Sequence, residues 1–283
     1  MSPSRPRRLR FAHLVRVLAT LAPLAFTVSA SAAPPFIDRP ITLPRHDWAF
    51  DVGVGLGFEN VTRSPSRTGA GLNLEMGVGL TDHVELGVRT GGRGGDDGAA
   101  TGADQFGRLF DRETFGTGSA TFANPEVRVR GALLRGGVAE VALEGRVVLP
   151  AERGTRTGVE VGAPLAFHAG RIVRIDTGVF IPVEFYDPAA VGVHFPISIW
   201  FQPAARLWLG PIAGFRFIHH HENLVAPGVN PDFDRTDFEL GFGLGYSITR
   251  TIDFKTMVLN RSLNHGNGVR DIGVGAGLQF RIE

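Results

Sequence analysis

From Asp47 onward, the chain places apolar residues at every second position over stretches of about ten residues. In the last stretch the apolar members are Ile272, Val274, Ala276, Leu278, Phe280 and Ile282. Glycine and polar residues occupy the positions between them. Because successive side chains of a strand point to opposite faces, each stretch has one apolar and one polar face. This pattern predicts strands of the kind that cross a membrane as a closed barrel.

About twelve stretches of this kind follow one another along the chain. We expect strands over residues 48–58, 71–80, 84–90, 126–134, 138–149, 158–167, 172–185, 191–201, 206–217, 235–248, 251–259 and 269–282. Tight turns alternate with longer joins, of which the longest are residues 91–125 and 218–234. Short turns at one end and longer loops at the other are typical of membrane barrels. The sequence therefore predicts an all-β, antiparallel, up-and-down transmembrane β-barrel of about twelve strands.

Four prolines lie within successive predicted strands, namely Pro164, Pro182, Pro196 and Pro211. Proline lacks the N–H group that a strand donates to its neighbour and is rare in the middle of a sheet. In one interpretation, β-bulges accommodate these prolines and the barrel has twelve strands. Otherwise the strand boundaries differ in this region, and the barrel has about ten or fourteen strands.

The predicted outward face comprises about sixty positions, and none of them is Asp, Glu, Lys or Arg. An Arg or Lys at the centre of a bilayer costs ~2–4 kcal/mol, so a lipid-facing surface excludes them. A soluble β-sandwich also alternates, but its outer face is polar and tolerates charges near strand ends. The strict exclusion favours the membrane barrel.

The segment before the first strand divides into two parts. Residues 1–32 carry several arginines, an apolar run at 17–28 and the cleavage pattern Ala30-Ser31-Ala32, which together predict a signal peptide. Residues 33–46 are rich in proline, and we expect a periplasmic lead-in that is extended and poorly packed. Residues 47–283 form the predicted barrel. A net charge of +1 offers no basic surplus for nucleic acid, and we expect no such partner.

The unit from Gly79 to Val88 resembles the strand–turn–strand units of bacterial outer-membrane β-barrel proteins. The last strand is similar to the signal by which the assembly machinery recognises such proteins. The resemblance is to the general class and implies the bacterial outer membrane, contact with its lipid and its assembly machinery, and a monomer. One departure is the C-terminal sequence Phe280-Arg281-Ile282-Glu283, since members of this class usually end on an aromatic residue.

The polar face of the predicted strands points into the lumen and carries charges of both signs. The candidates for lining this lumen are Glu75, Arg89, Arg128, Arg130, Glu144, Arg146, Glu160, Arg174 and Asp176. Buried charges must pair or stay hydrated, because an unpaired buried charge is costly. Two interpretations follow: ion pairs that fill the bore, or a hydrated path for small polar solutes.

Glycines form a second feature of the inward face. The first and last strands contribute Gly53, Gly55, Gly57, Gly273, Gly275 and Gly277, and the second strand adds Gly77 and Gly79. Barrel closure makes these strands neighbours, so one wall of the lumen is nearly bare backbone. We expect a folded-in outer loop, the lead-in or a ligand to pack there. Alternatively, the glycines only permit curvature of the sheet.

The favoured function is porin-like passage or uptake of small polar solutes through the lumen. The alternative is a closed structural or surface-binding barrel that acts through its outer loops, and a third hypothesis is an outer-membrane lipid hydrolase. His194 and Ser198 share an inward face with Asp176 nearby, but four residues of strand separate the first two by ~13 Å. Because G-x-S-x-G is absent as well, we expect no enzyme and no cofactor. Adjacent side chains of His219, His220 and His221 point apart on an extended chain, so no metal site is predicted either.

Overall fold

The computed structural model describes residues 35–60, 67–95, 122–150, 157–185, 189–221, 232–260, 263 and 270–283. The predicted signal peptide and the central parts of the two longest predicted loops lie outside these residues. Within the described ranges, no helix is long and apolar enough to cross a membrane.

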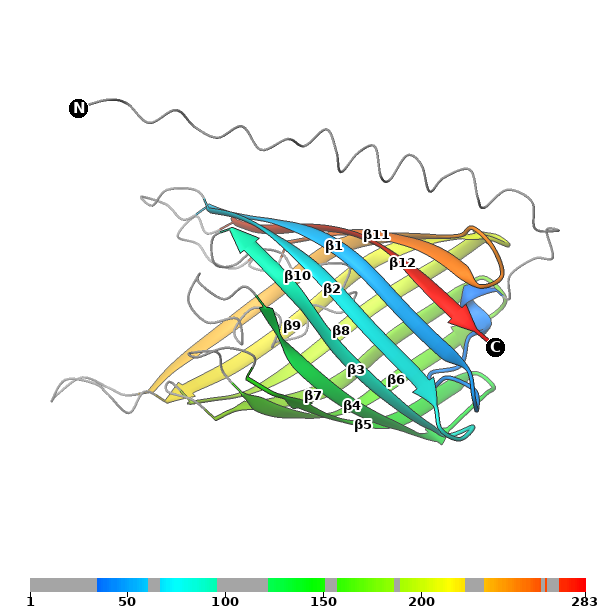
Figure 1. Cartoon of the computed structure of the whole chain (residues 1–283), viewed down its shortest axis with the longest axis horizontal. Helices are drawn as coiled ribbons and strands as arrows, with labels where there is room; N and C mark the ends of the chain where they lie inside the picture. Colours follow the sequence, from blue (N-terminus) through cyan, green and yellow to red (C-terminus); the bar gives the residue numbers. More distant parts are fainter. Residues whose placement is uncertain are drawn as a thin grey trace, which may run out of the picture. The chain divides into compact units, whose positions relative to one another are not determined.

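Twelve strands form the barrel, and the predicted strand number is confirmed. Their bounds are β1 (Trp48–Asn60), β2 (Arg67–Gly79), β3 (Val84–Gly95), β4 (Phe122–Leu134), β5 (Ala139–Val148), β6 (Gly158–Ala169), β7 (Val173–Glu184), β8 (Ala189–Ala204), β9 (Leu207–His221), β10 (Asp232–Ser247), β11 (Ile252–Asn260) and β12 (Arg270–Ile282). Each strand pairs antiparallel with its neighbours in the chain, and β1 pairs with β12 to close the sheet (Figure 1). A closed sheet leaves no strand edge unpaired, which a lipid environment requires.

Short turns join β2 to β3, β4 to β5, β6 to β7, β8 to β9 and β10 to β11 at one end of the barrel, here called the turn end. The first residue of β1 pairs with the last residue of β12, Trp48 with Ile282, at this same end. The long connections lie at the opposite end, here called the loop end. Two of the long predicted loops are shorter than expected, because β3 continues to Gly95 and β9 continues to His221.

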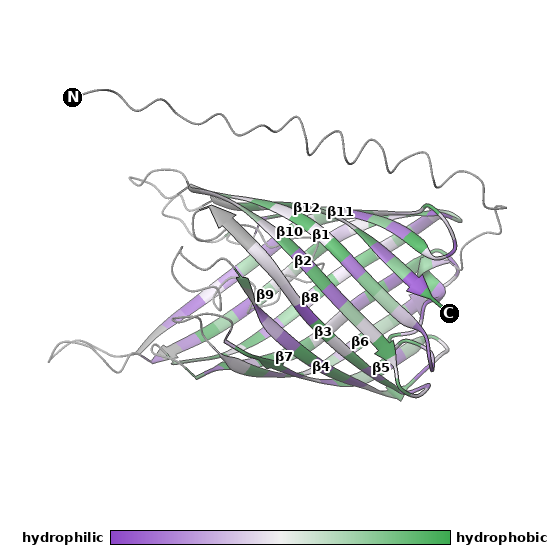
Figure 2. Ribbon diagram, viewed as in Figure 1, coloured by the Kyte–Doolittle hydropathy of each residue, from purple (hydrophilic) through white to green (hydrophobic). Residues whose placement is uncertain are grey.

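The outward face of the barrel is apolar, as the alternation predicts. Val54 is 57% exposed, Leu143 52% and Val161 61%, although all three lie in the middle of strands. Figure 2 shows hydrophobic and hydrophilic residues alternating along the strands. Large apolar side chains around the whole barrel would be unfavourable in water and match the hydrocarbon of a bilayer.

The prolines interrupt pairing locally without changing the register. Pro182 and Pro196 lie in β7 and β8, where the pairing is broken at both prolines. The β7–β8 register is the same on both sides of each gap, for example Thr177 with Ile197 and Phe180 with His194. Each proline therefore removes a local pair but does not end its strand, which is why the barrel keeps twelve strands.

Candidate functional site in the barrel lumen

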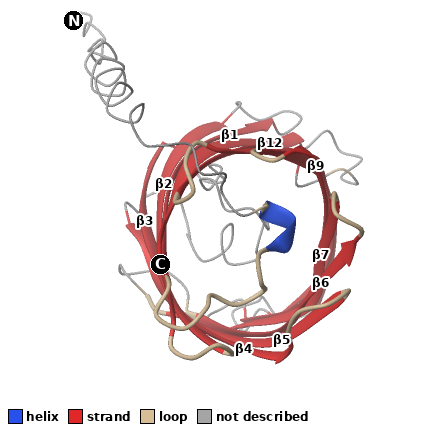
Figure 3. Cartoon of the chain, turned by 90° about the vertical axis from the view of Figure 1, so that its right-hand side faces the viewer, coloured by secondary structure: helices blue, strands red, loops and turns tan. Residues whose placement is uncertain are grey.

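The described part of the lead-in, residues 35–46, lies inside the barrel at the turn end. It contains the short 3-10 helix η2 (Phe36–Asp38), which Figure 3 shows within the ring of strands. Ile37 is 2% exposed, Ile41 7% and Thr42 1%. The expectation of a poorly packed lead-in is therefore wrong, because the polar and apolar side chains of the lumen provide partners that its own sequence does not reveal.

Main-chain amides of the lead-in donate to side chains of three different strands. The pairs are Ile37 N to Gln202 Oε1 at 3.1 Å, Ile41 N to Glu140 Oε2 at 2.7 Å, and Leu43 N to Glu85 Oε2 at 2.9 Å. Hydrogen bonds from amides to carboxylates are stronger than those between neutral groups. The lead-in is thus bound through its backbone, and β3, β5 and β8 supply the acceptors.

Two arginines of the lumen bind main-chain carbonyls of the same segment. Arg130 donates from Nη1 to the carbonyl of Ile41 at 3.0 Å, and Arg174 donates to the carbonyl of Arg39. Both arginines were predicted to line the lumen. Glu140 and Arg130 therefore bind both main-chain groups of one residue, Ile41.

The side chain of Arg39 is a second anchor. Its guanidinium makes two hydrogen bonds to Asp253 of β11, at 2.7 and 3.2 Å, and the Asp253 side chain is fully buried. Burial lowers the pKa of Arg39 to about 10, and the charge of Asp253 acts in the opposite direction. Arg39 therefore remains protonated at neutral pH, and the two-point ion pair is maintained.

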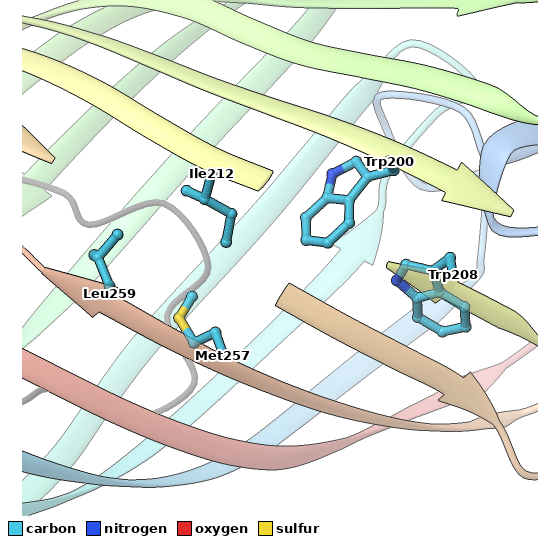
Figure 4. Close-up of a cluster of buried hydrophobic side chains, with 5 residues drawn as sticks. All are labelled: Trp200, Trp208, Ile212, Met257 and Leu259. Carbon is cyan, nitrogen blue, oxygen red and sulfur yellow. The ribbon is translucent and has the colours of Figure 1, made fainter. Parts of the chain in front are cut away.

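The third anchor is aromatic. The ring of Phe36 stacks on Trp208 with centroids 4.6 Å apart and parallel planes, and it meets Trp200 edge-on at 5.7 Å. Both indoles belong to an apolar cluster inside the lumen (Figure 4), which consists of Trp200, Trp208, Ile212, Met257 and Leu259. Aromatic contacts of these two geometries are favourable beyond the area they bury.

The two indoles, Trp200 of β8 and Trp208 of β9, cover glycines of β10. A Cβ on Gly245 would lie 2.1 Å from Cε2 of Trp208, and a Cβ on Gly243 would lie 2.7 Å from Cη2 of Trp200. The lead-in covers glycines of β2 in the same way, because a Cβ on Gly79 would lie 1.8 Å from the carbonyl oxygen of Pro44. Bare backbone at these positions makes room for the groups that pack on it.

A cavity of about 380 Å³ lies in the lumen beside the lead-in, and its lining includes residues of β1, β12 and most of the other strands. Gly53 and Gly277, which face each other across the β1–β12 pair, line the cavity. Gly55, Gly57, Gly273 and Gly275 also face the interior and are buried. Within the described residues, the predicted packing of the lead-in on glycine therefore occurs on β2, and at Gly53 and Gly277 the wall borders open space.

The nine predicted lumen residues divide into two groups. Five of them line the cavity: Glu75, Arg128, Arg130, Arg174 and Asp176. Their ion pairs include Arg128 with Glu75 at 3.1 Å and with Glu85 at 2.7 Å, and Arg174 with Asp176 at 2.7 Å. Positive and negative groups thus alternate around this open space.

The other four residues belong to a network centred on Arg146. Its guanidinium, with a fully buried side chain, lies 3.0 Å from Glu126, 3.6 Å from Glu144 and 3.6 Å from Glu160. Arg89 joins at the edge, 3.7 Å from Glu126, and donates to Asn73 at 2.6 Å. One group of lumen charges therefore forms a buried network and the other lines a cavity, and the ion pair of Arg130 with Glu144 connects the two groups.

Several important lumen residues were missed as site candidates. These are Glu85, Glu140, Gln202, Trp200, Trp208 and Asp253, all of which contact the lead-in. Their positions on the inward face follow from the alternation. Their common role does not, because the glycine wall suggested the lead-in only as one of three possible occupants and indicated none of the side chains that bind it.

The geometry gives no support for catalysis or for metal binding. Ser198 of β8 faces Asp176 of β7, but His194 lies four residues from Ser198 on the same strand, a separation of ~13 Å. His219–His221 belong to β9 and not to a loop, which corrects the expectation, and Nδ1 of His219 lies 2.8 Å from Asp234. In the part of the chain that the structure describes, no three metal-ligating side chains come together.

Known structures share this architecture. The barrel is similar to an outer membrane channel from Pseudomonas putida F1, with a TM-score of 0.62, 10% identity, and coverage of 90% of this chain and 100% of that one. It is also similar to the NanC porin, with a TM-score of 0.52, 10% identity, and coverage of 82% and 100%. No protein-family model matches the sequence, and no curated protein does so. The chain thus has the fold of these outer-membrane barrels, a closed β-barrel of twelve strands with an apolar outer surface, as the sequence predicts.

Proposed function

We propose that the barrel is a porin-like channel that passes small polar solutes through its charge-lined lumen. The observation that carries this proposal is the cavity of about 380 Å³ inside the closed barrel. Cavities of roughly 300–1,000 Å³ accommodate small molecules. The similarity of the fold to a porin and to an outer membrane channel supports the same function.

The chemistry of the cavity wall fits polar solutes. Arg128, Arg130 and Arg174 line the cavity together with Glu75 and Asp176, so both signs of charge are available along it. Side chains that already pair with one another can exchange partners with a passing solute and replace part of its hydration shell. We therefore expect only weak preference between cations and anions.

The lead-in crosses this path at the turn end. Arg39 and Phe36 anchor it to β11 and to the indoles of β8 and β9, so passage requires space beside the segment or its displacement. We expect small current steps from the intact protein and at least several-fold larger steps when both anchors are removed.

Single-channel recording in planar bilayers tests this function. The proteins to compare are the full-length chain, the double variant Phe36→Ala/Arg39→Ala, and Arg45→Ala as a control in an exposed part of the same segment. Ohmic current that rises in the double variant and not in the control supports the channel. Silence from all three proteins, each shown to be folded by its heat-dependent mobility in gels, would contradict it.

A closed barrel that acts through its outer loops is the second candidate. The buried network around Arg146 and the anchored lead-in favour it, because both fill the lumen with groups that hold each other. Silence in the bilayer experiment is the result that this candidate predicts. For the lipid hydrolase, an esterase assay on detergent-solubilised protein is the test, and we expect no turnover above that of buffer.

A further inference from the structure

The contacts of the lead-in are directed mainly at its backbone. Five side chains from five strands bind main-chain groups: Glu85 of β3, Arg130 of β4, Glu140 of β5, Arg174 of β7 and Gln202 of β8. Main-chain N–H and C=O groups are the same in every peptide. A site that binds them therefore does not depend on the particular sequence that fills it.

The bound main-chain groups belong to alternate residues of the segment that follows η2. The C=O group of Arg39, both main-chain groups of Ile41 and the N–H group of Leu43 are all engaged by the barrel. The chain bends at Ile41 and Thr42 between these contacts. Side chains of β3, β4, β5 and β7 therefore bind the backbone of the segment on both sides of this bend.

Two side-chain pockets supplement the backbone contacts. The indoles of Trp208 and Trp200 receive the ring of Phe36, and Asp253 receives the guanidinium of Arg39. These pockets select an aromatic residue and, three positions later, a basic residue. In peptide recognition, backbone hydrogen bonds provide affinity and such pockets provide specificity.

The segment is connected to the barrel by a single turn. Asp47 N donates to the carbonyl of Pro44 at 3.1 Å, and His46 N donates to the carbonyl of Gly79 at 2.8 Å. His46 has a φ of 69°, in the left-handed region that non-glycine residues rarely occupy. A rotation at this turn would withdraw the lead-in and leave Glu140 and Glu85, which are both buried, without its amides.

We propose that the turn end of the lumen is a binding site for a peptide that carries an aromatic residue followed three positions later by a basic one. The chain's own residues 36–43 fill this site in the structure, and a separate peptide of the same chemistry takes their place when they leave. The proposal rests on the proposed function and makes it more specific, because it names a peptide as the class of solute. The binding itself is measured without any current.

The experiment uses the full-length protein in detergent and a fluorescein-labelled peptide with the sequence of residues 35–46. Fluorescence anisotropy measures the Kd for wild type, for Phe36→Ala/Arg39→Ala and for Arg45→Ala. The double variant weakens the lead-in and leaves every side chain of the barrel unchanged. We expect it to bind the peptide at least tenfold more tightly than wild type does, because a tethered segment competes at a high effective concentration. Arg45→Ala should behave like wild type, since the Arg45 side chain is exposed.

Two further measurements test the mode of binding. A peptide methylated on the main-chain nitrogens that correspond to Ile41 and Leu43 should bind the double variant at least tenfold more weakly, as should the unmodified peptide when Glu140→Gln is added to the protein. Equal affinity of the wild type and the double variant for the peptide, or equal affinity of the methylated and unmodified peptides, would overturn the proposal. Should the double variant fail to fold, the single variants Phe36→Ala and Arg39→Ala provide the same comparison.

The outcomes separate this proposal from the channel function. Peptide binding by a protein that is silent in bilayers would leave the binding site standing and refute passage. Current through a protein that does not bind the peptide would refute the peptide site and leave passage standing.

Discussion

Two sectors of the lumen contain the same types of residue, yet they differ in what those residues bind. Around Arg146, the guanidinium binds the carboxylates of Glu126, Glu144 and Glu160, and none of these four residues lines the cavity described above. At the turn end, Arg130 and Arg174 bind the main chain of the lead-in beside a cavity of about 380 Å³. Charged residues on the inner face of a barrel can therefore either fill the lumen or line an open space within it. Which of the two they do depends on the groups that they bind.

The two sectors differ because their charged residues bind partners from different parts of the chain. The Arg146 network lies entirely on β4, β5 and β6, which cannot separate while the barrel stays closed. The partners of Arg130 and Arg174 include a segment that is attached to the barrel only at β1. The first sector is thus filled by the strands themselves, whereas the second is filled by a segment that we propose can leave.

The largest expected effect comes from breaking the permanent network. Arg146→Met removes one cation from among three buried carboxylates, and loss of one partner of a buried ion pair costs about 3–5 kcal/mol. We expect the free energy of unfolding in urea, measured by tryptophan fluorescence in lipid vesicles, to fall by about this amount. Lys255→Met is the matched change at the cavity, where water can hydrate Asp51 and Gln279 still donates to it. An equal loss for both variants would contradict the distinction between the two sectors.

A smaller effect is expected from the anchor of the removable segment. Arg39→Ala eliminates two hydrogen bonds to Asp253, and a hydrogen bond to a charged group contributes about 1.5–3 kcal/mol. Asp253 keeps contacts with Ser247 and Arg281, so the barrel itself should retain its stability. Limited proteolysis of the lead-in in detergent should become at least tenfold faster than in wild type or in Arg45→Ala. An unchanged rate would show that this ion pair does not hold the segment.

The smallest effect is expected at a glycine. Gly79→Ala places a methyl group against the carbonyl oxygen of Pro44, and overpacking of this kind costs about 1–3 kcal/mol. The segment should move away at its β1 side, so cleavage of the lead-in by protease should be moderately faster. Gly145→Ala is the control, because no atom lies within 4 Å of the added methyl group. If both substitutions leave the cleavage rate unchanged, the lead-in does not rest on β2.

The sequence predicted the barrel well because its signal is local. Alternation along a stretch such as residues 269–282 fixes both the strand and the face of every side chain, and the predicted candidates from Glu75 to Asp176 all lie on the inner face. The prolines left the strand number open, and only the pairing shows that the register continues past them.

The position of the lead-in could not be predicted from local patterns. Ile41 binds Glu140, 99 residues away, and Ile37 binds Gln202, 165 residues away. Proline-rich sequence indicates an extended backbone but not what surrounds it. The packing of Trp208 over Gly245 could not be predicted either, because a glycine in the sequence does not indicate which side chain will cover it.

The central claim is that residues 36–43 occupy the lumen, and a crosslink tests it most directly. The chain has no cysteine, so the double variant Ile41→Cys/Ala142→Cys carries the only two thiols, at positions that share one buried cluster. A short bifunctional maleimide should join them within one molecule in nearly full yield in lipid vesicles. The pair Arg45→Cys/Ala142→Cys, with Arg45 exposed, should react poorly. A crosslink yield for Ile41→Cys/Ala142→Cys no higher than that of this control would contradict the placement of the lead-in inside the barrel.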